Sequence, residues 1–265
     1  MCERLAMDVL SDVLTVMRTG TPRSHRSEYD GPWEQWYPPV PGSLGFHVVA
    51  SGTCRVDDQT LRAGDIVVVA DKGHMMSGDG PCVTLCGAYE VDPPRMHPLL
   101  RSLPPLLRGS SPATTLLNTE LAQPNLGSAA LIPALLDVLL VHALRSWCGT
   151  TTTGWAAALR DHPTAAALQA MHDNPAATWT VASLARTAGL SRATFARRFT
   201  AQTGQPPLGY LTWWRMTLAA RELRSTDAPL SAVATAVGYT SEFAFAAAFK
   251  RAFGVAPGRY RRSSG

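Results

Sequence analysis

Two stretches of this sequence share one pattern: LARTAGLSRATFARRFTAQTGQPPLGY at Leu184–Tyr210 and VATAVGYTSEFAFAAAFKRAFGVAPGRY at Val233–Tyr260. They are one short helical unit written twice, which indicates an internal duplication. After one residue of slack, the later matched positions lie 50 residues apart. The matched pairs are Ala185 with Ala234, Ala188 with Val237, Gly189 with Gly238, Phe195 with Phe245, Phe199 with Phe249, Gly204 with Gly254, Pro207 with Pro257 and Tyr210 with Tyr260.

Each copy has the pattern of a helix-turn-helix. The first helix ends at Gly189 or Gly238, because glycine adopts the left-handed backbone that such a turn needs. Ser191 and Ser241 then stand where the second helix requires an N-cap. The sequence therefore predicts two helix-turn-helix units in the rear half of the chain.

The second helix of the first copy has an apolar side and an arginine side. Phe195 and Phe199 are four residues apart and point together into the core. Small residues on the opposite face let a helix approach a DNA major groove, and arginine reads guanine through two hydrogen bonds. We expect Ser191 and Arg198 to contact phosphate groups; a merely solvated helix face is the alternative. The predicted DNA-facing residues of this helix are Ser191, Arg192, Ala193, Ala196, Arg197 and Arg198.

The second copy differs on the corresponding face. Glu242 and Ala247 occupy the positions of Arg192 and Arg197. Glu242 either accepts a hydrogen bond from cytosine or is simply exposed to solvent. We expect this copy to add affinity and weak shape selectivity, while the first copy reads the sequence. Its predicted DNA-facing residues are Ser241, Glu242, Phe243, Lys250 and Arg251.

Charge is divided unevenly along the chain. Residues 160–265 contain 13 Lys and Arg against 5 Asp and Glu, whereas residues 1–159 contain 11 against 15. A basic rear half suggests that only this half meets a polyanion. An ordinary solvated basic surface is the alternative, and charge alone does not separate the two.

Residues from about 165 to 262 resemble the DNA-binding domain of AraC/XylS-type regulators. The resemblance rests on SLARTAGLSRATFARRF, YLTWWRMTLAARELRST and VATAVGYTSEFAFAAAFKRAFGVAPGRYR. It implies seven helices in two helix-turn-helix units joined by a long helix, which Leu211, Trp214 and Leu218 have the spacing to anchor. Two recognition helices would then enter successive major grooves of double-stranded promoter DNA, roughly 34 Å apart.

The front third of the chain has the short β-branched runs and regular turn signals of a β domain. The segments GPWEQWYPPVPGSLGFHVVASGTCRV, LRAGDIVVVADKGH and LCGAYEVD resemble the cupin-type sensor domains that precede such DNA-binding domains. The resemblance implies a small antiparallel β-barrel with an internal pocket. The predicted strands are Phe46–Ala50, Thr53–Val56, Asp65–Val69 and Val83–Val91, the first two forming a hairpin.

The same resemblance draws attention to His47 and His74, because metal-binding cupin enzymes present three histidines and a carboxylate from two motifs. Here each motif keeps one histidine, and Val49 stands where a second ligand is expected. Two ligands are too few for a catalytic metal site. A transition metal in the pocket therefore requires Cys54, Cys86 or a distant side chain; otherwise the two histidines are polar groups of the pocket.

The cysteines support two interpretations. Cys82 and Cys86 are expected in one strand, about 13 Å apart on the same face, too far for a direct disulfide. A pairing with Cys54 predicts a thiol switch that responds to oxidants or electrophiles. The alternative is that these residues are small buried hydrophobes. The five cysteines are Cys2, Cys54, Cys82, Cys86 and Cys148.

From residue 124 the pattern becomes helical. An apolar helix is predicted at Ala129–Trp147, as core of the front domain or as a homodimer interface, and a second helix at Pro163–His172. We therefore expect a cupin-like sensor domain at 1–123, a helical linker and dimerisation region at 124–160, and a double helix-turn-helix DNA-binding domain at 161–265. The predicted fold class is multidomain α+β.

These patterns predict a sequence-specific transcription regulator that activates genes together with RNA polymerase, in response to a small molecule, a metal or an oxidant. The alternative is a cupin-type metal-dependent enzyme with an accessory helical domain, against which the missing metal ligands argue. Without a signal peptide or 18 uninterrupted apolar residues, the chain is expected to be cytoplasmic, with no membrane contact.

Overall fold

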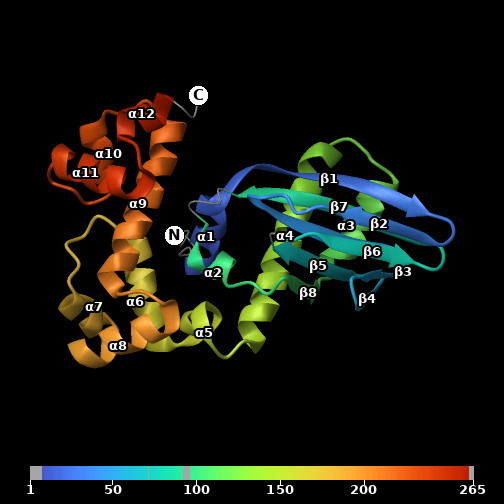
Figure 1. Cartoon of the computed structure of the whole chain (residues 1–265), viewed down its shortest axis with the longest axis horizontal. Helices are drawn as coiled ribbons and strands as arrows, with labels where there is room; N and C mark the ends of the chain where they lie inside the picture. The colour runs from blue at the N-terminus through green and yellow to red at the C-terminus, as the bar shows by residue number, and fades with distance from the viewer. Residues whose placement is uncertain (1–7, 71, 92–95, 263–265) are drawn as a thin grey trace, which may run out of the picture. The chain divides into compact units, whose positions relative to one another are not determined.

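The computed structural model describes residues 8–70, 72–91 and 96–262, and it divides into two compact units (Figure 1). Met17–Thr151 form the sheet-rich unit. The helical unit contains the residues up to Val16 together with everything from Thr152 onward. Each unit is described separately below.

The sheet-rich unit contains eight strands and three helices among the described residues. Its hydrogen-bonded strand order is β1-β7-β3-β5-β8, with β2 paired to β6 and β4 paired to β3. The path ends at β1 and β8, so the sheet of this cupin-like, antiparallel unit is open. The elements are β1 (Arg18–Tyr29), β2 (Trp33–Tyr37), β3 (Ser43–Val56), β4 (Gln59–Arg62), β5 (Asp65–Ala70), β6 (His74–Gly78), β7 (Cys82–Val91), α2 (Pro98–Arg101), β8 (Leu106–Ser110), α3 (Ala113–Ala122) and α4 (Ser128–Thr150).

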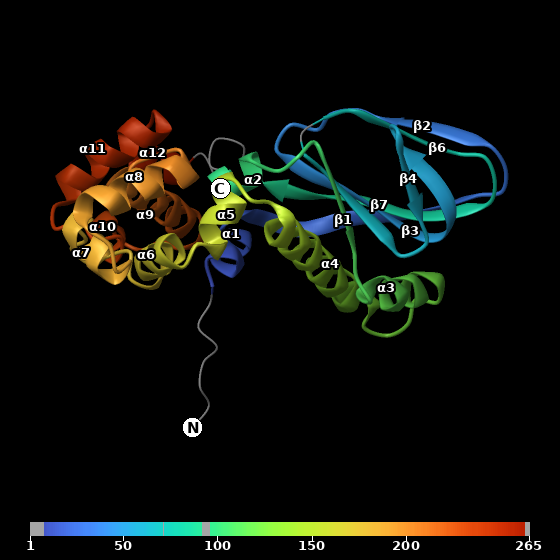
Figure 2. The same cartoon turned by 90° about the horizontal axis from the view of Figure 1, so that it is seen from below.

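Alternation along β3 and β5 separates the two faces of the sheet. Phe46 and Val48 face Leu136 and Leu139 of α4, which packs on this side of the sheet (Figure 2). The residue between them, His47, points to the opposite face, as successive strand residues must. Its cross-strand neighbours are Cys86 on β7 and Val67 on β5. A predominantly apolar face therefore holds a histidine and a cysteine side by side.

The strand predictions are confirmed for β5 and β7, but the hairpin predicted before β5 is wrong. Phe46–Ala50 and Thr53–Val56 belong to the single long strand β3, and Cys54 lies in a hairpin with β4 instead. β3 remains continuous because its first part pairs with β5 and β7 and its last part with β4 and β6. Five strands were not predicted from the sequence: β1, β2, β4, β6 and β8. In β1 and β2, exposed residues follow one another without alternation.

The helical unit contains nine helices among its described residues, counting α1, and seven of them run from α6 to the end, as the resemblance implied. They form two helix-turn-helix units, α7–α8 and α10–α11, joined by α9. The elements are α1 (Val9–Met17), α5 (Gly154–Arg160), α6 (His162–Asp173), α7 (Val181–Thr187), α8 (Arg192–Thr203), α9 (Pro207–Ser225), α10 (Leu230–Ala236), α11 (Glu242–Phe253) and α12 (Pro257–Arg262).

The predicted turns and caps are confirmed in both helix-turn-helix units. Gly189 and Gly238 have positive φ angles of 65° and 81° between the two helices of each unit. The Ser191 side chain accepts from the Thr194 amide at the start of α8, and Ser241 caps α11 in the same way. The pairs Phe195 with Phe199 and Phe245 with Phe249 are fully buried.

The long helix α9 is anchored in both helix-turn-helix units, as predicted. Leu211 and Trp214 are buried near its start, where it packs against α8. Met216 and Leu223 belong to the core of the second unit, and Leu218 packs against that core. One rigid helix therefore carries both helix-turn-helix units.

Two boundaries differ from the predicted regions. The apolar helix α4 packs on the sheet, since Leu136, Leu139 and Leu144 are buried there, so it extends the sheet-rich unit to Thr151. The first helix, α1, belongs to the helical unit although it precedes the first strand. By length and composition, α4 also passes for a membrane span, a test that the core helices of soluble proteins pass as well.

Candidate nucleic-acid interface and ligand cavity

The exposed face of α8 carries the predicted DNA-reading residues. Arg192, Ala193 and Arg197 are exposed, while Phe195 and Phe199 fix the helix from behind with no exposed surface. The Ser191 hydroxyl accepts a hydrogen bond from the Thr194 amide, so the helix is capped by its own N-terminal residue. This face can approach base edges closely, because its arginines project beyond small neighbours such as Ala196.

Arg198 takes a different position from the other two arginines. Its guanidinium donates to both carboxylate oxygens of Asp161, with an Nε to Oδ2 distance of 3.0 Å. Asp161 is also the N-cap of α6, where it accepts from the Thr164 amide. These hydrogen bonds lower the pKa of Asp161 against the opposing effect of burial. Arg198 thus ties α8 to α6, and a phosphate contact by this residue has to share it with Asp161.

The corresponding face of α11 has little hydrogen-bonding capacity in its middle. Glu242 is exposed and Ala247 is half-buried. Phe243 is 85% exposed at the start of the helix, beside the Ser241 cap. Lys250 and Arg251, the basic residues predicted to face DNA at the end of the helix, are exposed.

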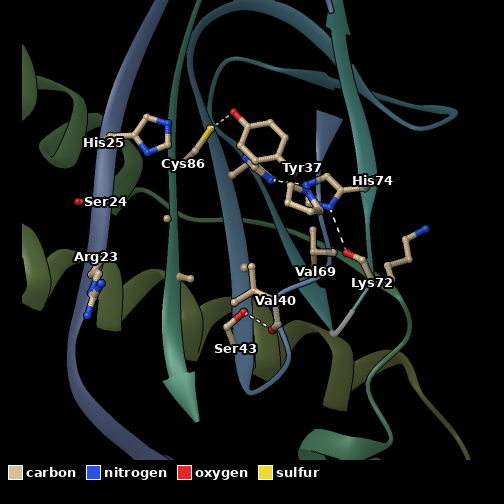
Figure 3. Close-up of a pocket in the computed structure, with 15 residues that line it drawn as sticks. Arg23, Ser24, His25, Tyr37, Val40, Ser43, Val69, Lys72, His74 and Cys86 are labelled. Atoms are coloured by element: carbon tan, nitrogen blue, oxygen red, sulfur yellow. Dashed lines mark hydrogen bonds between the residues drawn. The ribbon is translucent and has the colours of Figure 1, made fainter. Parts of the chain in front are cut away.

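The sheet-rich unit contains a cavity of about 320 Å³, on the sheet face opposite α4 (Figure 3). Both predicted histidines line it, together with Cys86. Its other walls are mostly apolar, from the strands and from the β2–β3 loop. They comprise Arg23, Ser24, His25, Tyr37, Pro38, Val40, Ser43, Gly45, Val69, Lys72, Gly87 and Ala88.

His47 and His74 meet at one wall of this cavity. Their Nε2 atoms are 2.6 Å apart, and Tyr37 stacks on the His74 ring with ring centroids 5.3 Å apart. Burial, followed by the neighbouring His74, lowers the pKa of His47 to about 3. Burial also lowers the pKa of His74. Both imidazoles are therefore neutral at physiological pH, and they share one hydrogen bond.

The contacts assign a tautomer to each ring. Nδ1 of His74 lies 3.4 Å from the Lys72 carbonyl oxygen, which only accepts, so this nitrogen carries the proton. Nε2 of His74 then accepts from the Nε2–H of His47. Within the described part of the chain, Nδ1 of His47 has no hydrogen-bond partner.

The two imidazoles do not by themselves form a metal site. The described residues contain no group of three or more His, Cys, Asp or Glu side chains arranged to hold an ion. The short contact between His47 and His74 also occupies the two nitrogens that face each other. The donor set therefore falls short of the three protein ligands of a catalytic centre, and it suits the alternative of polar groups in a pocket.

Among the described residues that line the cavity, Lys72 and Arg23 both have carboxylate partners. Lys72 contacts Asp57 at 2.7 Å, and Arg23 contacts Glu90 at 3.0 Å. Burial raises the pKa of the Cys86 thiol, to which the Tyr37 hydroxyl donates at 3.3 Å, so both groups remain protonated. The polar end of the cavity is therefore electrically neutral while still offering hydrogen bonds.

The cysteines of the sheet are free, buried thiols. Cys54 on β3 and Cys82 on β7 belong to the same buried apolar cluster as Cys86. Burial, followed by the neighbouring Cys82, raises the pKa of Cys54 to about 12. Cys54 and Cys82, whose pairing the sequence left open, thus lie in one buried cluster. Cys148 is buried on α4, and Cys2 lies outside the described residues.

Several cavity residues were not foreseen. Tyr37 contacts both histidines and Cys86, and it lies in β2, a strand that the sequence did not predict. Arg23 and His25 belong to β1, another missed strand. A tyrosine that closes the run WEQWY is a weak signal, because aromatic residues are common in any strand.

Comparison with known proteins matches each half of the chain to a family. Residues 8–149, more than half of the chain, match the Cupin family model, and residues 184–263 match a helix-turn-helix domain. A protein of Streptomyces lividans named as an AraC-like transcription regulator is 35% identical over 300 residues, which cover 97% of this chain and 98% of that protein. The RCS-specific HTH-type transcriptional activator RclR of Escherichia coli is 30% identical over 240 residues, 82% of this chain and 84% of that protein.

The solved DNA-binding domain of AdpA, in complex with a target DNA, is similar to 39% of this chain and to 92% of its own length, with 33% identity and a TM-score of 0.37. The full-length relatives are transcription regulators, and nothing in the comparisons supports the enzyme alternative. The chain belongs to the AraC-like transcription regulators, with a cupin domain in front of a helix-turn-helix DNA-binding domain.

Proposed function

We propose that an uncharged, largely apolar small molecule in the 320 Å³ cavity controls promoter binding by this regulator. The observation that carries the proposal is the neutral polar end of the cavity. The imidazoles of His47 and His74 are uncharged, the Cys86 thiol is protonated, and both Lys72 and Arg23 are paired with carboxylates. Among the described lining residues, an anionic ligand has to compete with the carboxylates that already pair with Lys72 and Arg23, whereas a hydroxyl, carbonyl or amide group finds hydrogen-bonding partners.

A matched pair of probes tests this assignment of ligand class. Benzamide and benzoate share one skeleton and differ in charge. We expect benzamide to raise the melting temperature of the wild-type chain at millimolar concentration, and benzoate to have no effect. Neither compound should act on an Ala88→Phe variant, in which the ring fills the cavity. A larger shift with benzoate overturns the uncharged class.

The proposal assigns the reading of DNA sequence to α8. Arg192 and Arg197 project from a helix that its own cap and two buried phenylalanines hold rigidly. The exposed face of α11 contributes affinity and shape selectivity, because its polar groups lie at its two ends. A gel-shift assay against genomic fragments tests DNA recognition. Saturable, salt-dependent and sequence-selective binding supports it, and absence of such binding with or without ligand and oxidant overturns it.

In the cytoplasm, the regulator would activate transcription as a homodimer that contacts RNA polymerase at the promoter. Support for the dimer comes from α4, where Leu131 and Val138 are exposed on a helix whose opposite side packs on the sheet. Sedimentation of wild type and of a Leu131→Glu/Val138→Glu variant tests it. A wild-type monomer at micromolar concentration contradicts the dimer.

An oxidant is a second candidate signal, and the Cys54–Cys82 contact favours it. Two neighbouring thiols can form a disulfide with loss of two electrons and two protons, which diamide accepts as its N=N bond becomes a hydrazine. Promoter output with and without diamide or hypochlorite tests this in wild type and in Cys54→Ser and Cys86→Ser variants. Identical responses in all three proteins eliminate the thiol switch and leave the pocket ligand.

A further inference from the structure

The two helix-turn-helix units touch each other directly, at a point away from the helix α9 that carries both. The turn of the second unit, at Gly238, lies against Ala176 in the loop of residues 174–180 that leads into the first unit. A Cβ atom at Gly238 would lie 2.7 Å from the carbonyl oxygen of Ala176 and 2.8 Å from its Cα atom. The two backbones therefore pack so closely that no side chain fits between them.

Arg215, on α9, completes this contact. Its Nε donates to the Pro175 carbonyl at 2.7 Å, and its Nη2 donates to the Ala177 carbonyl at 2.8 Å. The planar guanidinium holds both carbonyls in one fixed geometry. Nη2 also lies 2.8 Å from the place that a Cβ atom of Gly238 would take. We name the contact of Arg215 with residues 175–177 and with Gly238 the brace.

The loop side of the brace is tied to the first recognition helix. The Asn174 carbonyl accepts from the Ala177 amide at 3.2 Å and from the Trp179 indole at 2.9 Å, so the loop has a defined shape. Thr180 then caps α7 in a capping box with Ser183. Because α7 packs against α8, a displacement of this loop displaces the helices of the first unit.

The turn side of the brace is tied to the second recognition helix. Gly238 stands three residues before Ser241, the N-cap of α11. Tyr239, next to it, packs edge-on against Phe245 in the core of the second unit, with ring centroids 5.9 Å apart. The brace therefore connects the loop before α7 with the turn before α11.

We propose that the brace fixes the spacing between the two DNA segments that one chain reads, with Arg215 as its positioning residue. The inference rests on the proposed function, since it needs both α8 and α11 to bind DNA. Two units held only by one helix could rock about its axis or bend it, and a contact away from that axis removes this freedom (Figure 1). One base pair inserted between the segments displaces the second by about 3.4 Å and rotates it by about 35°. A braced pair of recognition helices cannot follow that change.

Selection of random-sequence DNA by the full-length chain tests the brace, because it reports the two selected segments and their spacing separately. Arg215→Met removes both hydrogen bonds and keeps an unbranched apolar stem. Arg221→Met, at an exposed position of the same helix, is the matched control for the loss of a positive charge.

The duplication supplies a second matched pair, Gly238→Ala and Gly189→Ala. Both glycines have positive φ angles, so alanine strains both turns. At Gly238 the added Cβ atom also meets Ala176 of the other unit. At Gly189 it meets no atom of the described residues within 4 Å beyond its two chain neighbours. The difference between the two variants therefore isolates the contact between the units.

We expect wild type, Arg221→Met and Gly189→Ala to select two segments at one spacing. Arg215→Met and Gly238→Ala should select the same two segments at two or more spacings. On single sites, one inserted base pair should raise the dissociation constant of wild type about tenfold or more, and that of Arg215→Met less than about threefold. Where Arg215→Met lowers the folded fraction, Arg215→Gln takes its place, because its amide carries a single donor nitrogen.

The other outcomes separate the brace from the proposed function. If Arg215→Met and Gly238→Ala keep one spacing and the wild-type penalty, the brace is overturned and DNA reading by both helices stands. Equal broadening in Arg221→Met and Gly189→Ala also overturns it. If wild type selects only one segment, or none, DNA reading by two helices is wrong and the brace falls with it. A general loss of stability lowers affinity at every spacing alike, so it does not broaden the spacing.

Discussion

The two helix-turn-helix units are built alike on the inside and differently on the outside. Each has a serine cap, a buried phenylalanine pair and a glycine that ends the recognition helix. On the exposed face, Arg192 and Arg197 of α8 correspond to Glu242 and Ala247 of α11. The duplicated residues are therefore those that hold the helix in place, while the exposed residues that we propose to meet DNA have diverged. The shared fold and the proposed reading of DNA belong to different sides of the same helix.

The largest expected effect lies on the shared side. Phe199→Ala and Phe249→Ala should each reduce the free energy of unfolding by about 3–5 kcal/mol, because both remove a fully buried ring. Urea titration of the full chain, followed by far-UV circular dichroism, measures this loss. Phe243→Ala is the control, since its ring is 85% exposed, and should cost less than about 0.5 kcal/mol. A small loss at either buried position breaks the equivalence of the two cores.

The next effect lies on the diverged side. Arg197→Ala should weaken binding at the cognate site by about 1–3 kcal/mol and relax selection at one base pair. The motivation is the exposure of Arg197 on the face opposite Phe195 and Phe199. Selection of random-sequence DNA by wild type and variant measures it. Equal weakening on all sequences shows that Arg197 contacts phosphate only.

The two serine caps should be equivalent and worth less. Ser191→Ala and Ser241→Ala each remove the acceptor for an amide in the first turn and should cost about 1 kcal/mol of unfolding free energy. Ser231→Ala, an exposed position on α10, is a control outside the caps. If only Ser191→Ala also weakens DNA binding, its hydroxyl does more in the first unit than cap the helix.

The smallest expected effect separates the two interpretations of Glu242. Glu242→Gln should strengthen binding to all sequences by less than about 1 kcal/mol, because it removes a negative charge from an exposed position of the proposed DNA-facing surface. Binding assays at several salt concentrations measure the change. A loss of affinity confined to sites with a cytosine at one position identifies Glu242 as a base reader instead.

The sequence predicted the helical unit well because the signals that specify this unit are local. Caps, turn glycines and the spacing of Phe195 and Phe199 act within a few residues, and duplication repeats the pattern. It predicted the sheet less well. β1 and β2 expose successive residues, so they lack the alternation that marks a strand.

The cavity and the hydrogen bond between Asp12 and His172 depend on contacts that no local sequence pattern contains. His47 and His74 were identified as pocket residues, but their shared hydrogen bond arises from pairing between distant strands. Asp12 and His172 are 160 positions apart, and neither stands in a motif. Residues with such partners are visible only once the backbone has placed them together.

The contribution of α1 to the helical unit changes how this half of the protein can be reused. A chimeric regulator that joins a foreign sensor to the chain from Thr152 onward discards Asp12, so Nδ1 of His172 loses the carboxylate that lies 3.1 Å from it. A transplant that carries residues 8–17 on a short tether keeps that acceptor. The portable DNA-binding module of this protein is therefore two pieces of chain, and its natural boundary is set by a hydrogen bond rather than by a linker.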